Sequence, residues 1–331
     1  MDAPPFVVPS EPFHLHLLNN CEKYGGTVAL TDADSERSLT FRDVYLLSHR
    51  MAAEFKKIGV EKKCTDELAT YQQQTGSRFL VACSYQSERL HGIEDVKVIL
   101  METLLDPLDN SDGIDSEFEP EVVLGPDSLL LAPFSSGSSG TPKCALLTHD
   151  NYSAATAALK EGLFDGLKAV RESTLAMLPF YHASGFWALL FCLLEGHHSI
   201  ILSSFNVGRM LELIDKYEIS IINVVPSIVT VLSRVEQPIP SIRIVLCGSA
   251  PLGKELSEAL LQRHPSIEHL IQGYGMTEVV VLSHASPPNA ATATGKYGSC
   301  GQLLPGFEAK IVNECGEEVN AYETGELLLR G

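Results

Sequence analysis

The sequence predicts an α/β fold in which β-sheets in several layers are flanked by helices. From residue 128 onward, short apolar runs alternate with amphipathic stretches, which is the pattern of strands and helices in a shared sheet. The chain of 331 residues is long enough for one large or two ordinary domains with a substantial core. Hydrophobic residues make up 45% and charged residues 20% of it, as is normal for a soluble globular protein.

The first part of the chain, residues 1–127, contains short strands and one clear amphipathic helix. The helix is predicted because Val44, Leu47 and Met51 recur on one helical face. The expected elements are, in order, strands 28–30 and 39–41, a helix over 42–58, strands 79–83 and 96–101 with a helix between them, and an acidic, turn-rich connector over 105–125.

The second part, residues 128–305, carries the regular alternation of strands and helices. Its expected strands are 129–133, 145–148, 200–202, 221–225, 242–247 and 269–271, and its expected helices are 152–161, 207–217, 227–235 and 253–264. The tail, 306–331, alternates around a glycine turn from Lys310 onward, which indicates a small antiparallel unit.

Charge and cysteine usage narrow the function classes. A formal net charge of −18 argues against a surface for nucleic acid or anionic membranes. Eight cysteines without a C-x-x-C pair are typical of reduced thiols. The N-terminus lacks the basic region of a signal peptide, and the longest apolar run, 186–194, is too short to span a bilayer. We therefore expect an intracellular protein, cytoplasmic or peroxisomal; its oligomeric state is not predicted.

The loop from Ser135 to Lys143 is the most informative segment. Its glycines let backbone N–H groups turn inward, its hydroxyls add donors, and Lys143 adds a positive charge, so it suits a polyphosphate. The alternative is a flexible Ser/Gly linker, but a linker would not lie between two apolar strands. Pro142 before the lysine and Cys144 after it do not match a Walker P-loop, which disfavours an NTPase of that class.

Four further segments offer small-residue turns or reactive side chains after apolar strands. They are 178–185 (LPFYHASG), 247–252 (CGSAPL), 272–278 (QGYGMTE) and 298–305 (GSCGQLLP). Residues 274–278 place an aromatic face, a hydroxyl and a carboxylate within five positions. The alternatives are that Tyr274 belongs to the core and that Glu278 is only solvated. For His182 taken alone, a buried and satisfied histidine is the favoured interpretation.

Taken in this order, the motifs resemble the adenylate-forming (AMP-binding) superfamily, in its acyl-CoA synthetase and 4-coumarate-CoA ligase branch. The resemblance covers almost all of 10–331, with the loop at 135–143 and GYGMTE at 273–278 as its most specific parts. It implies an incomplete form of the large N-terminal domain of these enzymes. Residues 1–127 would be the N-terminal part of that domain, 128–305 the nucleotide- and acyl-binding core, and 306–331 the start of a small β subdomain.

The resemblance also implies the reaction and its reagents. A small-molecule carboxylic acid attacks the α-phosphate of ATP in the presence of Mg²⁺, and the resulting acyl-adenylate passes its acyl group to coenzyme A. The aliphatic residues 279–282 would border the acyl pocket, so the acid is expected to be hydrophobic, either fatty or aryl.

Particular residues take roles by this resemblance. The phosphate-binding loop would comprise Ser135, Ser136, Gly137, Ser138, Ser139, Gly140 and Lys143. The rest of the nucleotide site would comprise Ser249, Ala250, Pro251, Gln272, Gly273, Tyr274 and Thr277. Thr277 would bind the α-phosphate and Glu278 would hold Mg²⁺. The expected catalytic residues are Thr277, Glu278 and His182, and the expected acyl pocket comprises His182, Ser184, Val279 and Val280.

The sequence departs from the family pattern at two places. Between Lys63 and Cys64, relatives carry roughly 35–45 further residues, about one strand-helix-strand unit. The chain also stops at Gly331, before the ribose-binding aspartate and the C-terminal lid domain with its catalytic lysine. Two hypotheses follow: an acyl-CoA synthetase-like ligase, or a catalytically weak or inactive truncated form that binds only nucleotide or acyl ligand.

Overall fold

The computed structural model describes residues 7–58, 77–84, 96–104, 125, 127–135, 143–164, 172–288 and 297–331. Four features expected from the sequence lie outside these residues. They are the junction at Lys63–Cys64, the helix between the strands at 79–83 and 96–101, residues 105–124 of the connector expected at 105–125, and the loop interior at 136–142.

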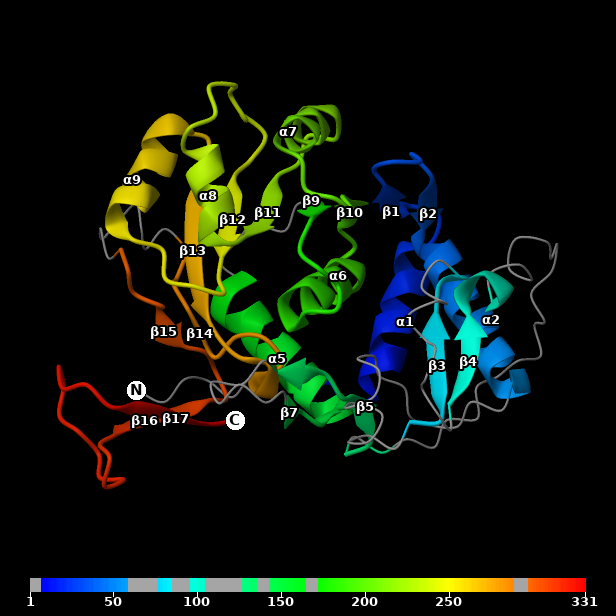
Figure 1. Ribbon diagram of the computed structural model, residues 1–331, viewed down its shortest axis with the longest axis horizontal. Helices are drawn as coiled ribbons and strands as arrows, with labels where there is room; N and C mark the ends of the chain where they lie inside the picture. Colours follow the sequence, from blue (N-terminus) through cyan, green and yellow to red (C-terminus); the bar gives the residue numbers. More distant parts are fainter. Residues whose placement is uncertain are drawn as a thin grey trace.

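Nine strands of the described chain form the central sheet (Figure 1), in the order β15-β14-β13-β12-β11-β9-β10-β1-β2. The strands from β13 to β1 run parallel to their neighbours, whereas β14, β15 and β2 pair antiparallel at the two ends. Their bounds are β1 Val28–Asp32, β2 Ser38–Thr40, β9 Ser173–Ala176, β10 His198–Ile201, β11 Ile221–Val224, β12 Ile244–Cys247, β13 His269–Tyr274, β14 His284–Ala285 and β15 Gln302–Leu303.

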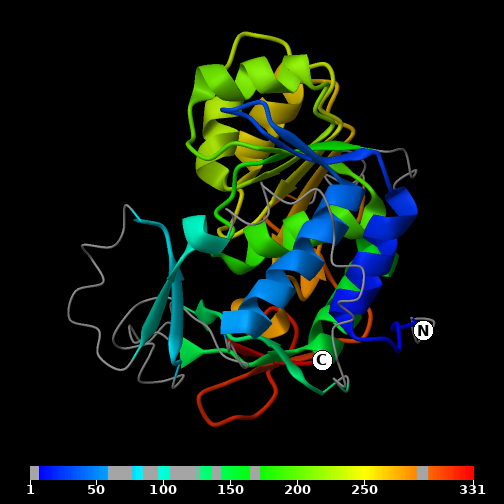
Figure 2. The ribbon, with the colours of Figure 1, turned by 90° about the vertical axis from the view of Figure 1, so that its right-hand side faces the viewer.

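Helices cover both faces of this sheet (Figure 2). On one face lie α7 (Val207–Lys216), α8 (Pro226–Leu232) and α9 (Lys254–Arg263). On the other lie α1 (Phe13–Tyr24), α5 (His149–Leu159) and α6 (Ala183–Glu195), with α2 (Phe41–Ile58) beside α1. The α/β architecture with flanking helices predicted from the sequence is thus confirmed.

Consecutive residues of the central strands face opposite helix layers. Ile221, Ile244 and Ile271 join the core beneath α5 and α6. Their strand neighbours Ile222, Val245 and Leu270 join the core beneath α7, α8 and α9. Because both faces of these strands are buried, the strands are continuous apolar runs rather than alternating ones.

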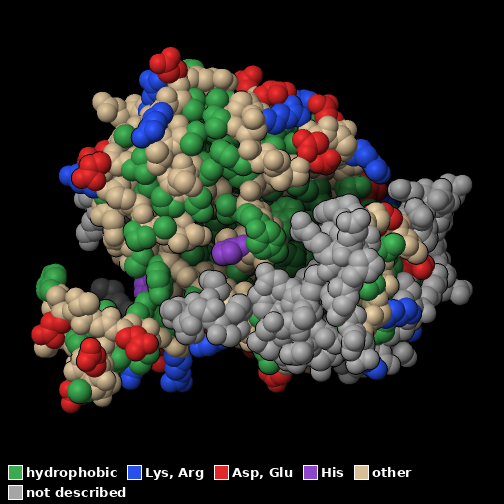
Figure 3. Space-filling model, in the orientation of Figure 1, with side chains coloured by type: hydrophobic (Ala, Val, Ile, Leu, Met, Phe, Trp, Pro, Cys, Tyr) green, Lys and Arg blue, Asp and Glu red, His purple; other side chains and the backbone are tan. Residues whose placement is uncertain are grey.

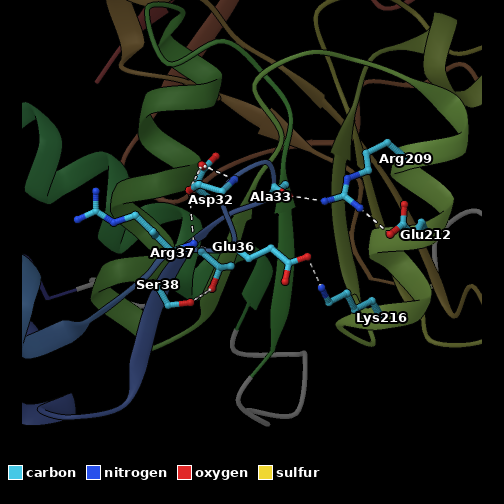
Figure 4. A network of polar contacts seen from close by, with 10 residues as sticks. Asp32, Ala33, Glu36, Arg37, Ser38, Arg209, Glu212 and Lys216 are labelled. Atoms are coloured by element: carbon cyan, nitrogen blue, oxygen red, sulfur yellow. Dashed lines mark hydrogen bonds and ion pairs between the residues drawn. The ribbon is translucent and has the colours of Figure 1, made fainter.

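The β1–β2 end of the sheet is fixed to α7 by polar contacts (Figure 4). Arg209 donates a hydrogen bond to the backbone oxygen of Ala33 and forms an ion pair with Glu212 at 2.6 Å. Lys216 Nζ lies 2.6 Å from a carboxylate oxygen of Glu36. Surface ion pairs of this kind contribute little each, so their main effect is to set where the β1–β2 turn lies.

Within the described residues, four smaller strand pairs lie outside the central sheet. The parallel pair is β3 (Phe79–Ala82) with β4 (Lys97–Leu100). The antiparallel pairs are β5 (Leu129–Leu131) with β8 (Leu147–Thr148), β6 (Phe134–Ser135) with β7 (Lys143–Cys144), and β16 (Glu308–Val312) with β17 (Glu326–Arg330). The pairs β5–β8 and β6–β7 follow each other along one hairpin, and in the sequence β6 leads into the predicted phosphate loop.

Local side-chain caps explain where helices begin. The chain enters α2 at Phe41, inside the strand expected at 39–41, because Asp43 accepts the backbone N–H of Thr40 at 2.8 Å and Thr40 Oγ1 accepts that of Asp43 at 3.1 Å. In the same way Thr148 and Asn151 form a capping box that starts α5 at His149.

No helix in the described part of the chain has the length and apolar character needed to cross a membrane.

Candidate functional site

Three of the sequence motifs follow strands that end at one edge of the central sheet. Since β9, β12 and β13 belong to the parallel set, their carboxyl ends meet at the same edge. They lead into residues 177–182, 248–252 and 275–278 respectively. The strand order also reverses between β9 and β11, and such reversal points are where open α/β sheets bind ligands.

The turn after β12 is braced against β13. The buried side chain of Gln272 accepts a hydrogen bond from the backbone N–H of Leu252 at 3.2 Å. Ser249 adopts a left-handed backbone with φ of 68°, and Ser249, Ala250 and Pro251 are all exposed. The turn therefore presents a small, open surface, and the side chain of Gln272, a residue expected at the nucleotide, holds this turn to the neighbouring strand.

The loop after β13 is folded back tightly by glycines. Tyr274 pairs with His284 across β13 and β14, and the backbone oxygen of Tyr274 accepts the N–H of Ser283 at 3.0 Å. A Cβ on Gly275 would lie 1.7 Å from the backbone oxygen of Val281, a distance that no real side chain allows. Only glycine fits at this position, so the loop places Thr277 and Glu278 on a closely packed return of the chain.

A γ-turn at Val280 closes the same loop. Val280 has φ 69° and ψ −59°, and the N–H of Val281 donates to the backbone oxygen of Val279 at 2.8 Å. This is the rarer, strained form of γ-turn, and it is unusual for a β-branched residue. Burial explains why it persists: Val280 is only 2% exposed and packs in the core that includes Ile271 and Ala285.

The β6–β7 hairpin meets this loop directly. Ser135 Oγ donates a hydrogen bond to Glu278 Oε1 at 2.8 Å, although 143 residues separate them. Ser135 is also the strand partner of Lys143, whose side chain is exposed. The structure thus brings together three of the expected site residues, Ser135, Lys143 and Glu278, from two distant parts of the chain.

His284 is a neighbour of the site that the sequence did not indicate. Its ring lies edge-on to the half-exposed ring of Tyr274, with centroids 5.9 Å apart, and its Nδ1 lies 3.0 Å from Ser283 Oγ. Burial lowers the pKa of His284, which favours the neutral imidazole at physiological pH. The sequence could have indicated His284 only through its pairing with Tyr274, and that pairing depends on the register of β13 against β14.

His182 and Ser184 lie at the start of α6 and contact each other. His182 Nδ1 is 2.8 Å from Ser184 Oγ and caps the helix by accepting the backbone N–H of Ser184. His182 is exposed, so the interpretation of it as a buried histidine, which its sequence context alone favoured, is wrong.

A recess between α6 and β9, lined by Leu178, Phe180 and others, has a volume of about 10 Å³. It holds about one water molecule and is too small for an acyl chain.

The face drawn in Figure 3 shows hydrophobic side chains gathered around a hollow near its centre. The expected loop residues Ser136, Gly137, Ser138, Ser139 and Gly140 lie outside the described residues.

Among the described side chains, no three His, Cys, Asp or Glu residues cluster as a metal cage would require. A single carboxylate such as Glu278 fits Mg²⁺ nonetheless, because protein-bound Mg²⁺ commonly takes one or two carboxylates and completes its shell with substrate phosphates and water.

Comparison with known proteins decides the family. A profile of the family described as AMP-binding enzyme matches residues 64–331. The chain belongs to this family. Its curated relatives include the 4-coumarate–CoA ligase of Pinus taeda, 28% identical over 370 residues that cover 97% of this chain and 68% of the relative. Another is 4-coumarate-CoA ligase 1 of Narcissus pseudonarcissus, 26% identical, covering 99% of this chain and 69% of the relative.

Solved structures agree on the fold. The o-succinylbenzoate coenzyme A synthetase of Bacillus subtilis, in complex with ATP and magnesium ion, superposes with a TM-score of 0.79 at 23% identity and covers 96% of this chain and 70% of that one. A long-chain-fatty-acid–CoA ligase of Archaeoglobus fulgidus reaches 0.85 at 20% identity, covering 100% of this chain and 76% of that one. At these identities the two likenesses show that the chain shares the fold of these enzymes.

Proposed function

We propose that this chain activates a hydrophobic carboxylic acid with ATP and Mg²⁺ to an acyl-adenylate and transfers the acyl group to coenzyme A. The observation that supports it most is the contact between Ser135 of the hairpin and Glu278 of the loop after β13. Lys143, on the paired strand, adds an exposed positive charge beside this contact. The positive side chain can bind phosphate oxygens directly, and the carboxylate can hold a divalent cation that binds further phosphate oxygens. Together the two groups suit a polyphosphate.

The electrostatics of the chain give these groups a specific task. With a net charge of −18, the protein repels a polyanion unless a local cation neutralises the phosphates. Lys143 would hold phosphate oxygens, Thr277 would donate to the α-phosphate, and Glu278 would hold Mg²⁺. When bound there, Mg²⁺ would neutralise charge on the departing pyrophosphate. His182, at the start of α6, would border the acid.

The nature of the acid is inferred from the segment after Glu278. Residues 279–282 are all aliphatic, and Val279, Val281 and Leu282 are half-buried. A hydrophobic acid, aryl or fatty, is therefore favoured over a charged one. The curated relatives named above act on 4-coumarate by their names, which makes an aryl acid the first to try.

The second candidate is a form that binds nucleotide or acyl ligand with little or no turnover. Its support is the alignment with the pine relative, whose 370 positions exceed the 331 residues of this chain. Residues of that ligase within the aligned span therefore lack a counterpart here. Our prediction places this gap at Lys63–Cys64, directly before the first residue of the family match.

Pyrophosphate release with a panel of aryl and fatty acids tests the proposal. We expect acid-dependent release that Lys143→Ala and Glu278→Ala each reduce at least ~100-fold. Lys216→Ala and Glu212→Ala, exposed charges on α7, serve as matched controls and should leave it unchanged. Nucleotide binding without release for any acid would support the second candidate, and unchanged release in both site variants would remove their proposed roles.

A further inference from the structure

Ser135 occupies a place that its expected role does not explain. The resemblance assigns it to the phosphates, yet its hydroxyl is directed at Glu278 Oε1, 2.8 Å away. The backbone oxygen of Lys143 lies at 3.4 Å from the same hydroxyl. A serine has one proton to donate, and the shorter bond to a charged acceptor is the stronger of the two. The hydroxyl is therefore committed to the carboxylate.

Both ends of this contact are held by the fold. On one side, Ser135 lies in the β6–β7 ladder, and the N–H of Ala145 donates to the backbone oxygen of Pro133 at 2.8 Å. On the other, Glu278 lies in a short 3₁₀ turn (Thr277–Val279) closed by the γ-turn at the buried Val280. A hydrogen bond between two fixed segments orients the side chain between them, whereas an exposed glutamate alone would sample several rotamers.

The contact leaves the carboxylate asymmetric. Ser135 engages Oε1, so Oε2 is the oxygen that can face a cation without losing the bond. Groups that orient a metal-binding side chain in this way typically change metal affinity about 10–100-fold when removed.

We propose that Ser135 is a positioning residue that aims the Glu278 carboxylate at the divalent cation, rather than a ligand of the ATP phosphates. The proposal rests on the function proposed above and adds a division of labour within the hairpin. Ser135 sets cation affinity, whereas Lys143, its strand partner, sets phosphate affinity.

Direct binding of Mn²⁺, followed by electron paramagnetic resonance with and without ATP, tests this on the full chain. Ser135→Ala should weaken Mn²⁺ binding about 10–100-fold, and Ser135→Thr, which keeps the hydroxyl, should restore most of it. ATP affinity measured without a divalent cation should change less than about twofold in Ser135→Ala. Glu278→Gln should abolish the Ser135-dependent part of Mn²⁺ binding. Weakened metal-free ATP binding in Ser135→Ala, or unchanged Mn²⁺ affinity, would overturn the proposal.

Ser203→Ala is the matched control. Ser203 Oγ also donates to a carboxylate, Asp34 Oδ2 at 2.6 Å, across 169 residues and in an exposed setting. Its removal should leave Mn²⁺ affinity unchanged, and its melting temperature shows what loss of such a bond costs the fold.

The outcomes separate this proposal from the proposed function. Mn²⁺ binding that depends on Ser135, in a chain that releases no pyrophosphate, would keep the positioning role and reject the ligase. Acid-dependent release with Mn²⁺ affinity independent of Ser135 would do the reverse. A wild-type chain that binds neither Mn²⁺ nor ATP would overturn both.

Discussion

Replacing Gly275 with alanine tests the packing of the site loop most directly. An added Cβ would lie 1.7 Å from the backbone oxygen of Val281 and 2.6 Å from its carbonyl carbon, whereas real Cβ atoms essentially never come within 3.0 Å of such an atom. The obstacle is backbone rather than the end of a flexible side chain. To accept the methyl group, the loop between Tyr274 and His284 must open by more than about 1 Å.

The size of the effect follows from that displacement. Overpacking of a well-filled region costs about 1–3 kcal/mol. A shift of about 1 Å in groups that bind or orient a substrate can cost about 100-fold in rate. Because Thr277 and Glu278 lie between the two colliding segments, we expect the Gly275→Ala variant to lose both function and stability.

Urea unfolding and Mn²⁺·ATP binding measure these two losses separately. We expect the free energy of unfolding to fall by about 1–3 kcal/mol and the Mn²⁺·ATP affinity by at least tenfold. Gly26→Ala is the control, because nothing lies within 4 Å of a Cβ at that position. A Gly275→Ala variant that matches the wild type in both measurements would refute the described return of the chain.

Two further predictions concern the rest of the fold. Arg243→Met should lower the free energy of unfolding by about 3 kcal/mol in urea titrations, because it leaves the buried carboxylate of Glu172 without its ion pair. The double variant with Glu172→Gln should recover part of this loss. A fall of less than about 1 kcal/mol in Arg243→Met would contradict the burial of Glu172. Burial raises the pKa of Cys21 to about 11 and that of Cys247 to about 12, from an ordinary value of 9.0. Since these folded-state values lie above the unfolded one, the stability that they contribute is complete below pH 9 and is lost as pH rises through 11 and 12. Unfolding free energies measured from pH 8 upward should therefore decline beyond pH 9, and iodoacetamide at pH 8 should label the exposed Cys300 but not Cys247; labelling of Cys247 in the folded chain would count against its burial.

Continuous apolar runs made the central strands predictable. Strands were expected at 221–225 and 242–247 because both faces of a parallel strand are buried, and β11 and β12 lie within these ranges. Helix α1 was not predicted, since Phe13–Tyr24 mixes histidines and asparagines with leucines and is held by packing of Phe13 on Tyr152. Helix α6 escaped prediction for the opposite reason: its apolar residues surround the helix and show no single face.

The candidate site likewise has features that were expected before the structure and features that the sequence could not predict. The family resemblance led us to expect Lys143 and Glu278 in one site, and the hydrogen bond between Ser135 and Glu278 is in accord with that expectation. The γ-turn at Val280 could not be predicted, since valine disfavours positive φ and adopts it only where packing over-determines the turn. The contact between Tyr274 and His284 depends on strand register, which a sequence specifies weakly for strands of two residues.

The place of β1 in the sheet has a consequence for synthesis of the chain. Leu30 pairs with Ser199, and Thr31 Oγ1 lies 2.8 Å from His198 Nε2, so β1 gains its inner neighbour only after residue 201 has left the ribosome. At about 5–20 residues per second, a nascent chain waits roughly ten to thirty seconds for that segment. During this interval the β1–β2 ribbon has an open edge that can pair with another polypeptide. Co-expressed chaperones that cover such an edge should therefore raise the yield of folded protein.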